Sequence, residues 1–295
     1  MVVLIAVTLV VILIHLSLTV GSITASQAWS AVVGVGAALG LSGACFSPCH
    51  VTVLGSPDII GFTTGAATAA AISIIFFDAG VVLTGVAAIL GGLATAVFVY
   101  LMARQNSNTG GLRLVLVGIG TGAFLGAARD FFMVRADITG ASTVQLWSAG
   151  SLSGRDWNHA LLVLISCAVI VPALCIIVRR LRLMEMGDDA AGALGISVER
   201  TRLIAILLAV LLVGIATAAA GLIAFIALAA PQIARALARE DGVLVAASIS
   251  IGSGLLVAAD CLEQHVDIEL HTPVGLVTSL LGGVYLMWLL SRKEA

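Results

Sequence analysis

Long apolar stretches alternate with short polar breaks along almost the whole chain. About 20 consecutive apolar residues are enough for a helix to cross the hydrocarbon core of a bilayer, and stretches near this length recur ten times. They lie at 2–20, 30–47, 59–77, 80–103, 112–134, 159–178, 203–221, 223–238, 243–262 and 273–291. The eighth is short and contains Pro231, so it is the weakest candidate for a complete crossing. The pattern predicts an all-α, polytopic membrane protein of about ten transmembrane helices.

The first apolar stretch, residues 2–20, is interpreted as a membrane span and not as a cleaved signal peptide. No basic residue precedes it, and it is longer than the apolar part of a typical signal peptide. We therefore expect residues 1–295 to form a single transmembrane domain.

The composition supports a membrane protein and argues against soluble classes. Of the 295 residues, 60% are hydrophobic and only 10% are charged, whereas soluble domains carry about 25% charged residues. The 32 glycines suit helices that pack closely in lipid through small residues. A net charge of −2 without a basic patch gives no reason to expect a nucleic-acid partner.

The distribution of basic residues predicts the orientation in the membrane, because cytoplasmic loops are enriched in Lys and Arg. With ten spans and the N-terminus inside, eleven of the fourteen basic residues fall on the cytoplasmic side. These are Arg104, Arg113, Arg179, Arg180, Arg182, Arg200, Arg202, Arg235, Arg239, Arg292 and Lys293. Both termini and the polar segment 184–202 are therefore predicted to be cytoplasmic.

The polar segment 184–202, "MEMGDDAAGALGISVERTR", stands between two long apolar runs. Asp188 and Asp189 suit the start of a short helix, where negative charge interacts favourably with the helix dipole. Gly195 suits the end of that helix, and Ser197 suits the N-cap of the next. The segment is predicted to form two short helices at the membrane face. From the residues alone it is either a solvated connector or a docking surface for a soluble cytoplasmic partner.

The same segment resembles the coupling loop of the iron-siderophore and vitamin B12 family of ATP-binding-cassette (ABC) importer permeases. Further stretches resemble this family in the same order, from about residue 36 to the C-terminus. They are "GSPDIIGFTTGAA" (55–67), "LVLVGIG" (114–120), "LWSAGSLSGRDW" (146–157), "AGLIAFIALAAPQIAR" (220–235) and "TPVGLVTSLLGGVYLMWLL" (272–290). Within the family, "GSPDIIGF" and "MGDDAAGALGISVER" are most similar to second permease subunits of ferric-enterobactin importers.

The resemblance implies a non-catalytic permease in the inner, or plasma, membrane of a bacterium. In this family two permease subunits form a pathway along their interface, a periplasmic or lipid-anchored binding protein delivers the substrate, and two ATPase subunits drive transport. The second permease is expected to be a paralogue. The chain lacks a phosphate-binding loop of the form G-x-x-x-x-G-K-[ST], so ATP is expected to be used by a partner, and no cofactor is expected here. By resemblance, the ATPase contacts are Gly187, Asp188, Asp189, Leu194 and Gly195.

The chain departs from the family pattern before its second span. Relatives carry an Arg-x-Pro-Arg run there, and its arginines look like docking points for the binding protein. Here "ITASQAWSAVVGVGAALG" (23–40) enters the span directly, which predicts a shortened second span. The alternatives to a ferric-siderophore permease are therefore an assembly-competent but transport-impaired subunit, or an importer of another iron chelate or of cobalamin.

Candidate pathway residues are found near the outer ends of two segments. Arg129 and Asp130 lie near the outer end of the fifth span, and ionisable residues at membrane depth are functional candidates. Neighbouring helical residues point about 100° apart, which predicts that these two do not simply pair. The alternative is that both lie at headgroup level and snorkel. Gly150 and Ser151, by resemblance, belong to a loop that forms a short outer helix near the pathway mouth.

Other functional classes lack their sequence signals. The histidines and the five cysteines show no metal-ligand spacing, so no metal site is expected. A transporter driven by an ion gradient is expected to contain internal repeats, together with paired acidic residues near the membrane midplane or broken helices. The sequence shows no clear signal for these features. An intramembrane enzyme would need a motif such as H-E-x-x-H, and the sequence contains none.

Overall fold

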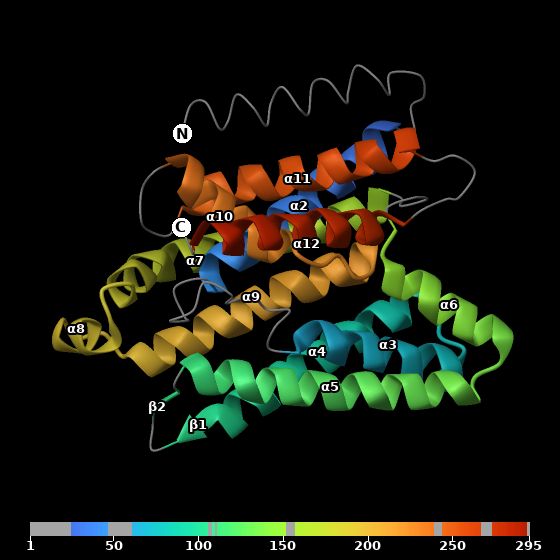
Figure 1. Cartoon of the computed structure of the whole chain (residues 1–295), viewed down its shortest axis with the longest axis horizontal. Coiled ribbons are helices and arrows are strands. Elements are labelled where there is room, and N and C mark those ends of the chain that lie inside the picture. Colours follow the sequence, from blue (N-terminus) through green and yellow to red (C-terminus); the bar gives the residue numbers. More distant parts are fainter. Residues whose placement is uncertain are drawn as a thin grey trace.

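The computed structural model describes residues 25–46, 61–105, 108–109, 111–151, 157–238, 244–266 and 273–293. Most helices run side by side along the long axis of the molecule (Figure 1). Their bounds are α2 (Ala25–Phe46), α3 (Phe62–Phe77), α4 (Val81–Ala103), α5 (Gly111–Arg135), α6 (Ile138–Ala149), α7 (Trp157–Met184), α8 (Asp188–Ala193), α9 (Val198–Ala220), α10 (Ile226–Ala238), α11 (Val245–Val266) and α12 (Val274–Lys293). Between α4 and α5, β1 (Arg104–Gln105) pairs antiparallel with β2 (Asn108–Thr109).

The predicted segments agree with the helices wherever the structure describes them. Nine of the ten segments coincide with α2, α3, α4, α5, α7, α9, α10, α11 and α12, and the first, 2–20, lies outside the described residues. Helix α10 has 13 residues and contains Pro231, which gives a length of about 20 Å. This is shorter than the hydrocarbon core of about 30 Å, so the weak eighth segment was interpreted correctly.

Two elements differ from the prediction. The second span was expected to be shortened, yet α2 begins at Ala25 and has 22 residues, as many as α11. Helix α6, with 12 residues, was not predicted as an element. Helix α6 ends at Ala149, directly before Gly150 and Ser151, and residues 152–156 lie outside the described residues. Helix α6 is short and contains several polar residues, so it does not form a long apolar stretch in the sequence.

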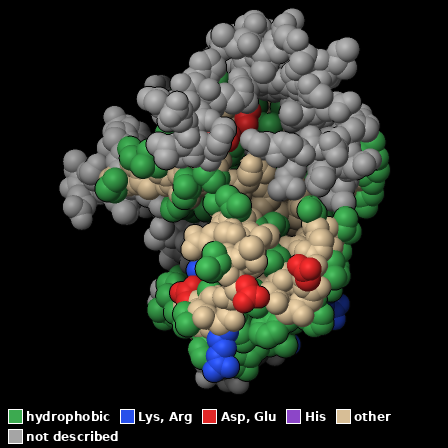
Figure 2. Space-filling model, turned by 90° about the vertical axis from the view of Figure 1, so that its right-hand side faces the viewer, with side chains coloured by type: hydrophobic (Ala, Val, Ile, Leu, Met, Phe, Trp, Pro, Cys, Tyr) green, Lys and Arg blue, Asp and Glu red, His purple; other side chains and the backbone are tan. Residues whose placement is uncertain are grey.

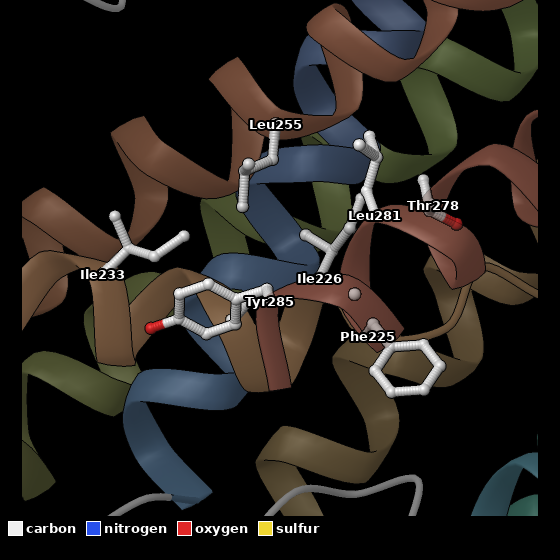
Figure 3. A pocket seen from close by; sticks show the side chains of 9 residues that line it. Phe225, Ile226, Ile233, Leu255, Thr278, Leu281 and Tyr285 are labelled. Atoms are coloured by element: carbon white, nitrogen blue, oxygen red, sulfur yellow. The ribbon is translucent and has the colours of Figure 1, made fainter. Parts of the chain in front are cut away.

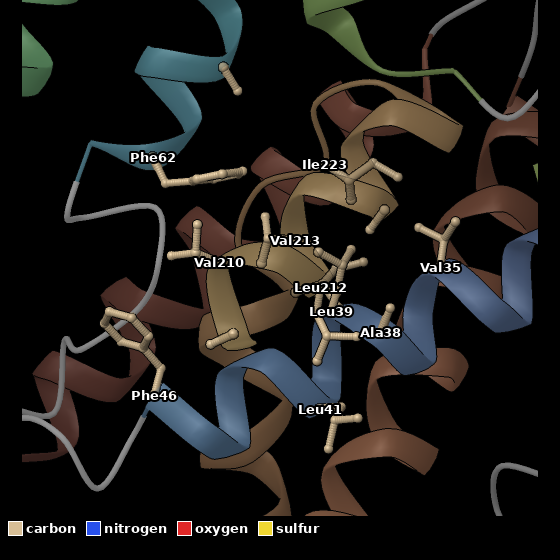
Figure 4. Packing of buried hydrophobic residues seen from close by; sticks show 14 of the residues in the cluster. Val35, Ala38, Leu39, Leu41, Phe46, Phe62, Val210, Leu212, Val213 and Ile223 are labelled. Carbon is tan, nitrogen blue, oxygen red and sulfur yellow. The ribbon is translucent and has the colours of Figure 1, made fainter. Parts of the chain in front are cut away.

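Buried apolar side chains of α2 and α9 form the centre of the bundle. Leu39 and Leu41 of α2 and Leu212 of α9 are each at most 2% exposed. Figure 4 shows Leu39 and Leu212 side by side between the two helices, Leu41 on the other side of α2, and Phe62 of α3 at the edge of the group. This core fixes α9, the helix that follows the candidate coupling segment.

Helices α2 and α11 approach so closely that their backbones touch. A Cβ atom built on Gly36 would lie 2.7 Å from the carbonyl oxygen of Gly252, and one built on Gly40 would lie 3.2 Å from the Gly252 Cα. The Ser253 hydroxyl also donates a hydrogen bond of 3.1 Å to the Val33 carbonyl. Close approach through small residues and a hydroxyl is how helices associate in lipid.

Large apolar side chains cover much of the outer surface. Val82 on α4, Val134 on α5 and Ile138 on α6 are each more than 80% exposed. Among the described residues, four helices are long and apolar enough to cross a membrane: Val81–Ala103, Arg113–Arg135, Val198–Ala220 and Val245–Glu263. In Figure 2 the described part of the end that carries α6 is a mixture of apolar side chains, backbone and uncharged polar side chains, and several acidic and basic side chains lie among them. The all-α, multi-pass membrane fold is confirmed.

Candidate functional site

A glycine with a positive φ angle lies on each side of the short helix α8 and separates it from the neighbouring helices. Gly187, before α8, has φ 105°, and Gly195, after it, has φ 80°; side chains other than glycine rarely adopt this conformation. The Ala191 N–H donates to the Gly187 carbonyl at 3.0 Å, and the Gly195 N–H donates to the Gly192 carbonyl at 2.9 Å. The predicted helix start at the two aspartates and its end near Gly195 are confirmed.

The second predicted short helix is instead the first turn of α9. Ser197 occupies the N-cap position of α9, as predicted, but makes no side-chain capping hydrogen bond. Its carbonyl accepts the Thr201 N–H at 3.0 Å. The segment 184–202 therefore contains one short helix, and the remainder continues directly into a long helix.

A small apolar cluster attaches α8 to the end of the bundle. Ala191 is fully buried and packs with Leu181 and Met184 of α7 and with Ala205 of α9. Ala191 is the one buried residue of α8. Apolar packing therefore holds α8 through a single small side chain, and most of its surface is open.

The side chain of Arg202 joins α8 to α9. Its Nη2 donates to both carboxylate oxygens of Asp188, at 2.9 and 2.8 Å, and its Nη1 donates to Glu199 Oε1 at 3.3 Å. The Arg202 side chain is 5% exposed, that of Glu199 26% and that of Asp188 44%. Charge-assisted bonds of this kind are stronger than bonds between neutral groups. Asp188 therefore links α8 to α9 within the segment.

A fourth side chain extends this network to α4. The Tyr100 hydroxyl, in the last turn of α4, donates to Glu199 Oε2 at 2.8 Å. Tyr100 is 6% exposed. We call Tyr100, Glu199, Arg202 and Asp188 the polar network. The central position of Arg202 in this network was not predicted, although Glu199 and Arg202 have the i,i+3 spacing of a helical ion pair.

The outward side of α8 exposes the other predicted contact residues. Gly187, Asp189 and Gly195 are exposed, and Leu194 is 61% exposed. Figure 1 places α8 at one extreme of the long axis and α6 at the other. Asp188 is exposed as well but is also bonded to Arg202, and the ATPase-contact role of all five residues stays a prediction.

Arg129 and Asp130 form an ion pair, contrary to the prediction. Arg129 Nε and Nη2 donate to Asp130 Oδ1 at 3.2 and 3.1 Å. Their side chains are 31% and 69% exposed. Although the Cα–Cβ bonds of adjacent residues diverge, the long arginine side chain can fold back to its neighbour. The positive charge of Arg129 is consequently compensated in this structure, and its role on the pathway stays a prediction.

Gly150 lies where three helices meet, at the end of α6. It has φ 69°, and its carbonyl accepts the Gly275 N–H at the start of α12, at 3.2 Å. The next residue, Ser151, donates its N–H to the Ala220 carbonyl at the end of α9, at 2.9 Å. A Cβ atom on Gly221 would lie 2.9 Å from the Gly150 Cα. These backbone contacts require glycine at both positions. They join α6, α9 and α12, and the predicted pathway role of Gly150 and Ser151 remains untested.

Comparisons with known proteins show to which family this chain belongs. The model of the FecCD transport family matches residues 7–292. The chain belongs to the FecCD transport family. It is 41% identical over 263 residues to the ferric enterobactin transport system permease protein FepG of Escherichia coli, covering 88% of this chain and 79% of FepG. It is 35% identical over 266 residues to the Fe(3+)-citrate import system permease protein YfmE of Bacillus subtilis, covering 88% of this chain and 79% of YfmE.

A solved structure shares the fold of this FecCD chain. It is an inward-facing metal-chelate type ABC transporter, with a TM-score of 0.86 and 21% identity, and the match covers 98% of each chain. Together with the family match, this confirms the resemblance found in the coupling-loop and span motifs.

A cavity of about 180 Å³ lies between α10, α11 and α12 of this FecCD chain (Figure 3). Apolar side chains such as Ile226, Leu255 and Leu281 line most of it, and Thr278 and Tyr285 add hydroxyl groups. No predicted site residue lines it. Among the residues that the structure describes, no group of three or more His, Cys, Asp or Glu side chains could hold a metal ion.

Proposed function

We propose that this chain is the permease subunit of an ABC importer that moves a ferric siderophore of the catecholate type into the cytoplasm. The 41% identity to the ferric enterobactin permease supports the catecholate over citrate, since the citrate permease is 35% identical. The observation that best supports the permease role is the position of α8. This short helix projects at one end of a membrane bundle, with Asp189 and Leu194 exposed.

In this proposal α8 is the docking surface for a separate ATPase subunit. Gly187 and Gly195 shape the two turns, Asp188 fixes the helix to Arg202, and Asp189 and Leu194 contact the partner. An exposed leucine beside an acidic side chain suits an interface with an apolar centre and a polar rim. The permease catalyses no reaction and binds no cofactor, and the ATPase hydrolyses ATP.

The proposal also includes the assembly and the orientation. A second permease, expected to be a paralogue, completes the pathway, and a periplasmic or lipid-anchored binding protein delivers the substrate on the outer side. Both termini are placed in the cytoplasm. Arg104 in β1 and the segment around α8 lie at the same end of the molecule (Figure 1), which supports a single cytoplasmic side rich in basic residues.

Docking through α8 is tested by Leu194→Arg, with Leu146→Arg as the matched control. The two leucines are 61% and 66% exposed, and Leu146 belongs to α6, at the opposite end. We expect Leu194→Arg to reduce co-purification of the ATPase with the membrane-inserted permease by about tenfold or more, as for a central interface residue. We expect Leu146→Arg to leave co-purification unchanged. Equal ATPase recovery from both variants would exclude α8 as the docking surface.

The substrate class is tested by uptake of iron in cells that lack the native permease. Cells given this chain with its cognate partners are expected to accumulate radiolabelled iron from ferric enterobactin at least about tenfold faster than from ferric citrate, which corresponds to about 1.4 kcal/mol of discrimination. Faster uptake from ferric citrate would reject the catecholate. Wild-type chain that reaches the membrane and binds the ATPase, yet imports neither chelate, would favour the transport-impaired subunit.

A further inference from the structure

Three helix ends meet at the polar network. The last turn of α4 contributes Tyr100, the first residue of α8 is Asp188, and the first two turns of α9 contribute Glu199 and Arg202. Arg202 stands at the centre with its side chain 5% exposed. Because the guanidinium is shielded from water, its bonds are screened less by salt than those of an exposed ion pair.

The bonds of the network are directional. The planar guanidinium of Arg202 uses Nη2 for Asp188 and Nη1 for Glu199, so both carboxylates are held in a fixed relation to one side chain. The second oxygen of Glu199 accepts the Tyr100 hydroxyl. The start of α8 therefore cannot shift against α9 without loss of bonds to Arg202. Likewise, the start of α9 cannot shift against α4 without loss of the Tyr100 bond.

The apolar attachment of α8 is small by comparison. Ala191 is its one buried residue, and an alanine side chain offers a single methyl group for packing. Besides the backbone turns that join α8 to α7 and α9, the bonds that end on Asp188 are its main side-chain attachment. These bonds give a force applied to α8 a route to α9 in addition to the chain itself.

We propose that Arg202 and Tyr100 are positioning residues that transmit displacement of α8 to α9 and α4. This inference rests on the proposed function, in which an ATPase moves α8. Transmission between distant sites needs a physical connection that holds its parts in defined arrangements. The polar network supplies that connection, and rocking of packed helices is a common form of such switching.

The inference is tested with Tyr100→Phe, which removes one hydroxyl and keeps the buried ring. Thr201→Val is the matched control, because the Thr201 hydroxyl is buried on the same helix as Arg202 and has no hydrogen-bond partner. Arg202→Lys is a second variant that keeps the charge but loses the planar fork. Each is assembled with its partner permease, ATPase and binding protein in lipid vesicles, and ATP hydrolysis and ferric enterobactin uptake are measured together.

We expect Tyr100→Phe and Arg202→Lys to lower the amount of substrate carried per ATP hydrolysed by about three- to tenfold, the range for loss of one typical intramolecular hydrogen bond. Thr201→Val is expected to match the wild type. A merely destabilised permease would lose uptake and hydrolysis in proportion and leave the ratio unchanged. An unchanged ratio in both network variants would overturn the inference.

A distance measurement separates failure of this inference from failure of the proposed function. Spin labels at Met102→Cys and Asp189→Cys, both exposed positions, report the separation of α4 and α8 in the full chain in lipid nanodiscs. Tyr100→Phe is expected to broaden this distance distribution, and Thr201→Val is not. If wild type binds no ATPase, the proposed function fails, whereas a distribution that Tyr100→Phe leaves unchanged overturns the positioning role itself.

Discussion

Replacement of Gly40 by leucine is expected to prevent the bundle from folding. A Cβ atom at this position would collide with the Ser248 carbonyl group of α11, with its carbon atom 2.9 Å away, and would lie 3.2 Å from the Gly252 Cα. Backbone atoms cannot move aside as the end of a flexible side chain can. Over-packing costs about 1–3 kcal/mol for extra methylene groups in a core, and we expect Gly40→Leu to exceed that range because two helix backbones must separate.

The control for this prediction is Gly140→Leu in α6. A Cβ atom built on Gly140 meets nothing within 4 Å, and leucine favours a helix over glycine by about 0.8 kcal/mol. The measurement is the fraction of monodisperse protein in detergent together with its Tm. Gly40→Leu should yield little monodisperse protein, and Gly140→Leu should behave as wild type. Close packing of α2 on α11 would be disproved if both variants had the Tm of the wild type.

The length and apolar character of the helices could be predicted from the sequence because membrane spans obey a simple rule. Backbone polar groups in lipid must be satisfied within the segment, so each long apolar run becomes a helix. This rule located nine described helices and recognised the short α10 around Pro231. It could not find α6, because a 12-residue helix with several polar side chains resembles a connecting loop.

The candidate site was predicted in part. Gly187, the two aspartates and Gly195 mark α8 through local rules of helix capping and positive φ angles, which act within a few residues. The polar network depends instead on contacts between distant residues: Tyr100 and Glu199 are separated by 99 positions. No local pattern fixes such a contact. The network emerges only when α4 and α9 are packed side by side.

The pairing of Arg129 with Asp130 was predicted incorrectly for a related reason. The Cβ atoms of neighbours on a helix point about 100° apart, which by itself predicts no pair. The arginine side chain is long enough to overcome this divergence, and its Nε and Nη2 both reach Asp130 Oδ1. Side-chain conformation, and not helix geometry alone, decides whether adjacent charges meet.

Reversal of charge in Arg202→Glu is expected to detach α8 from the bundle. The substitution places a third carboxylate beside Asp188 and Glu199, at a position where the side chain is 5% exposed. Breaking a buried ion pair costs about 3–5 kcal/mol. We expect the lower end of this range, because Asp188 is 44% exposed and can be solvated by water. The loss should appear as a lower Tm and as rapid thermolysin cleavage near Leu194 and Ile196.

The matched control is Arg200→Glu, two residues earlier in the same helix. Arg200 is exposed, and exposed charges contribute about 0–1 kcal/mol. Both substitutions replace one positive charge by a negative one in the same predicted cytoplasmic segment, so an effect on membrane orientation would be common to both. Resistance of Arg200→Glu to thermolysin, together with cleavage of Arg202→Glu, would assign the effect to the polar network. Equal cleavage of the two variants would show that total charge of the segment, and not the position of Arg202, holds α8 in place.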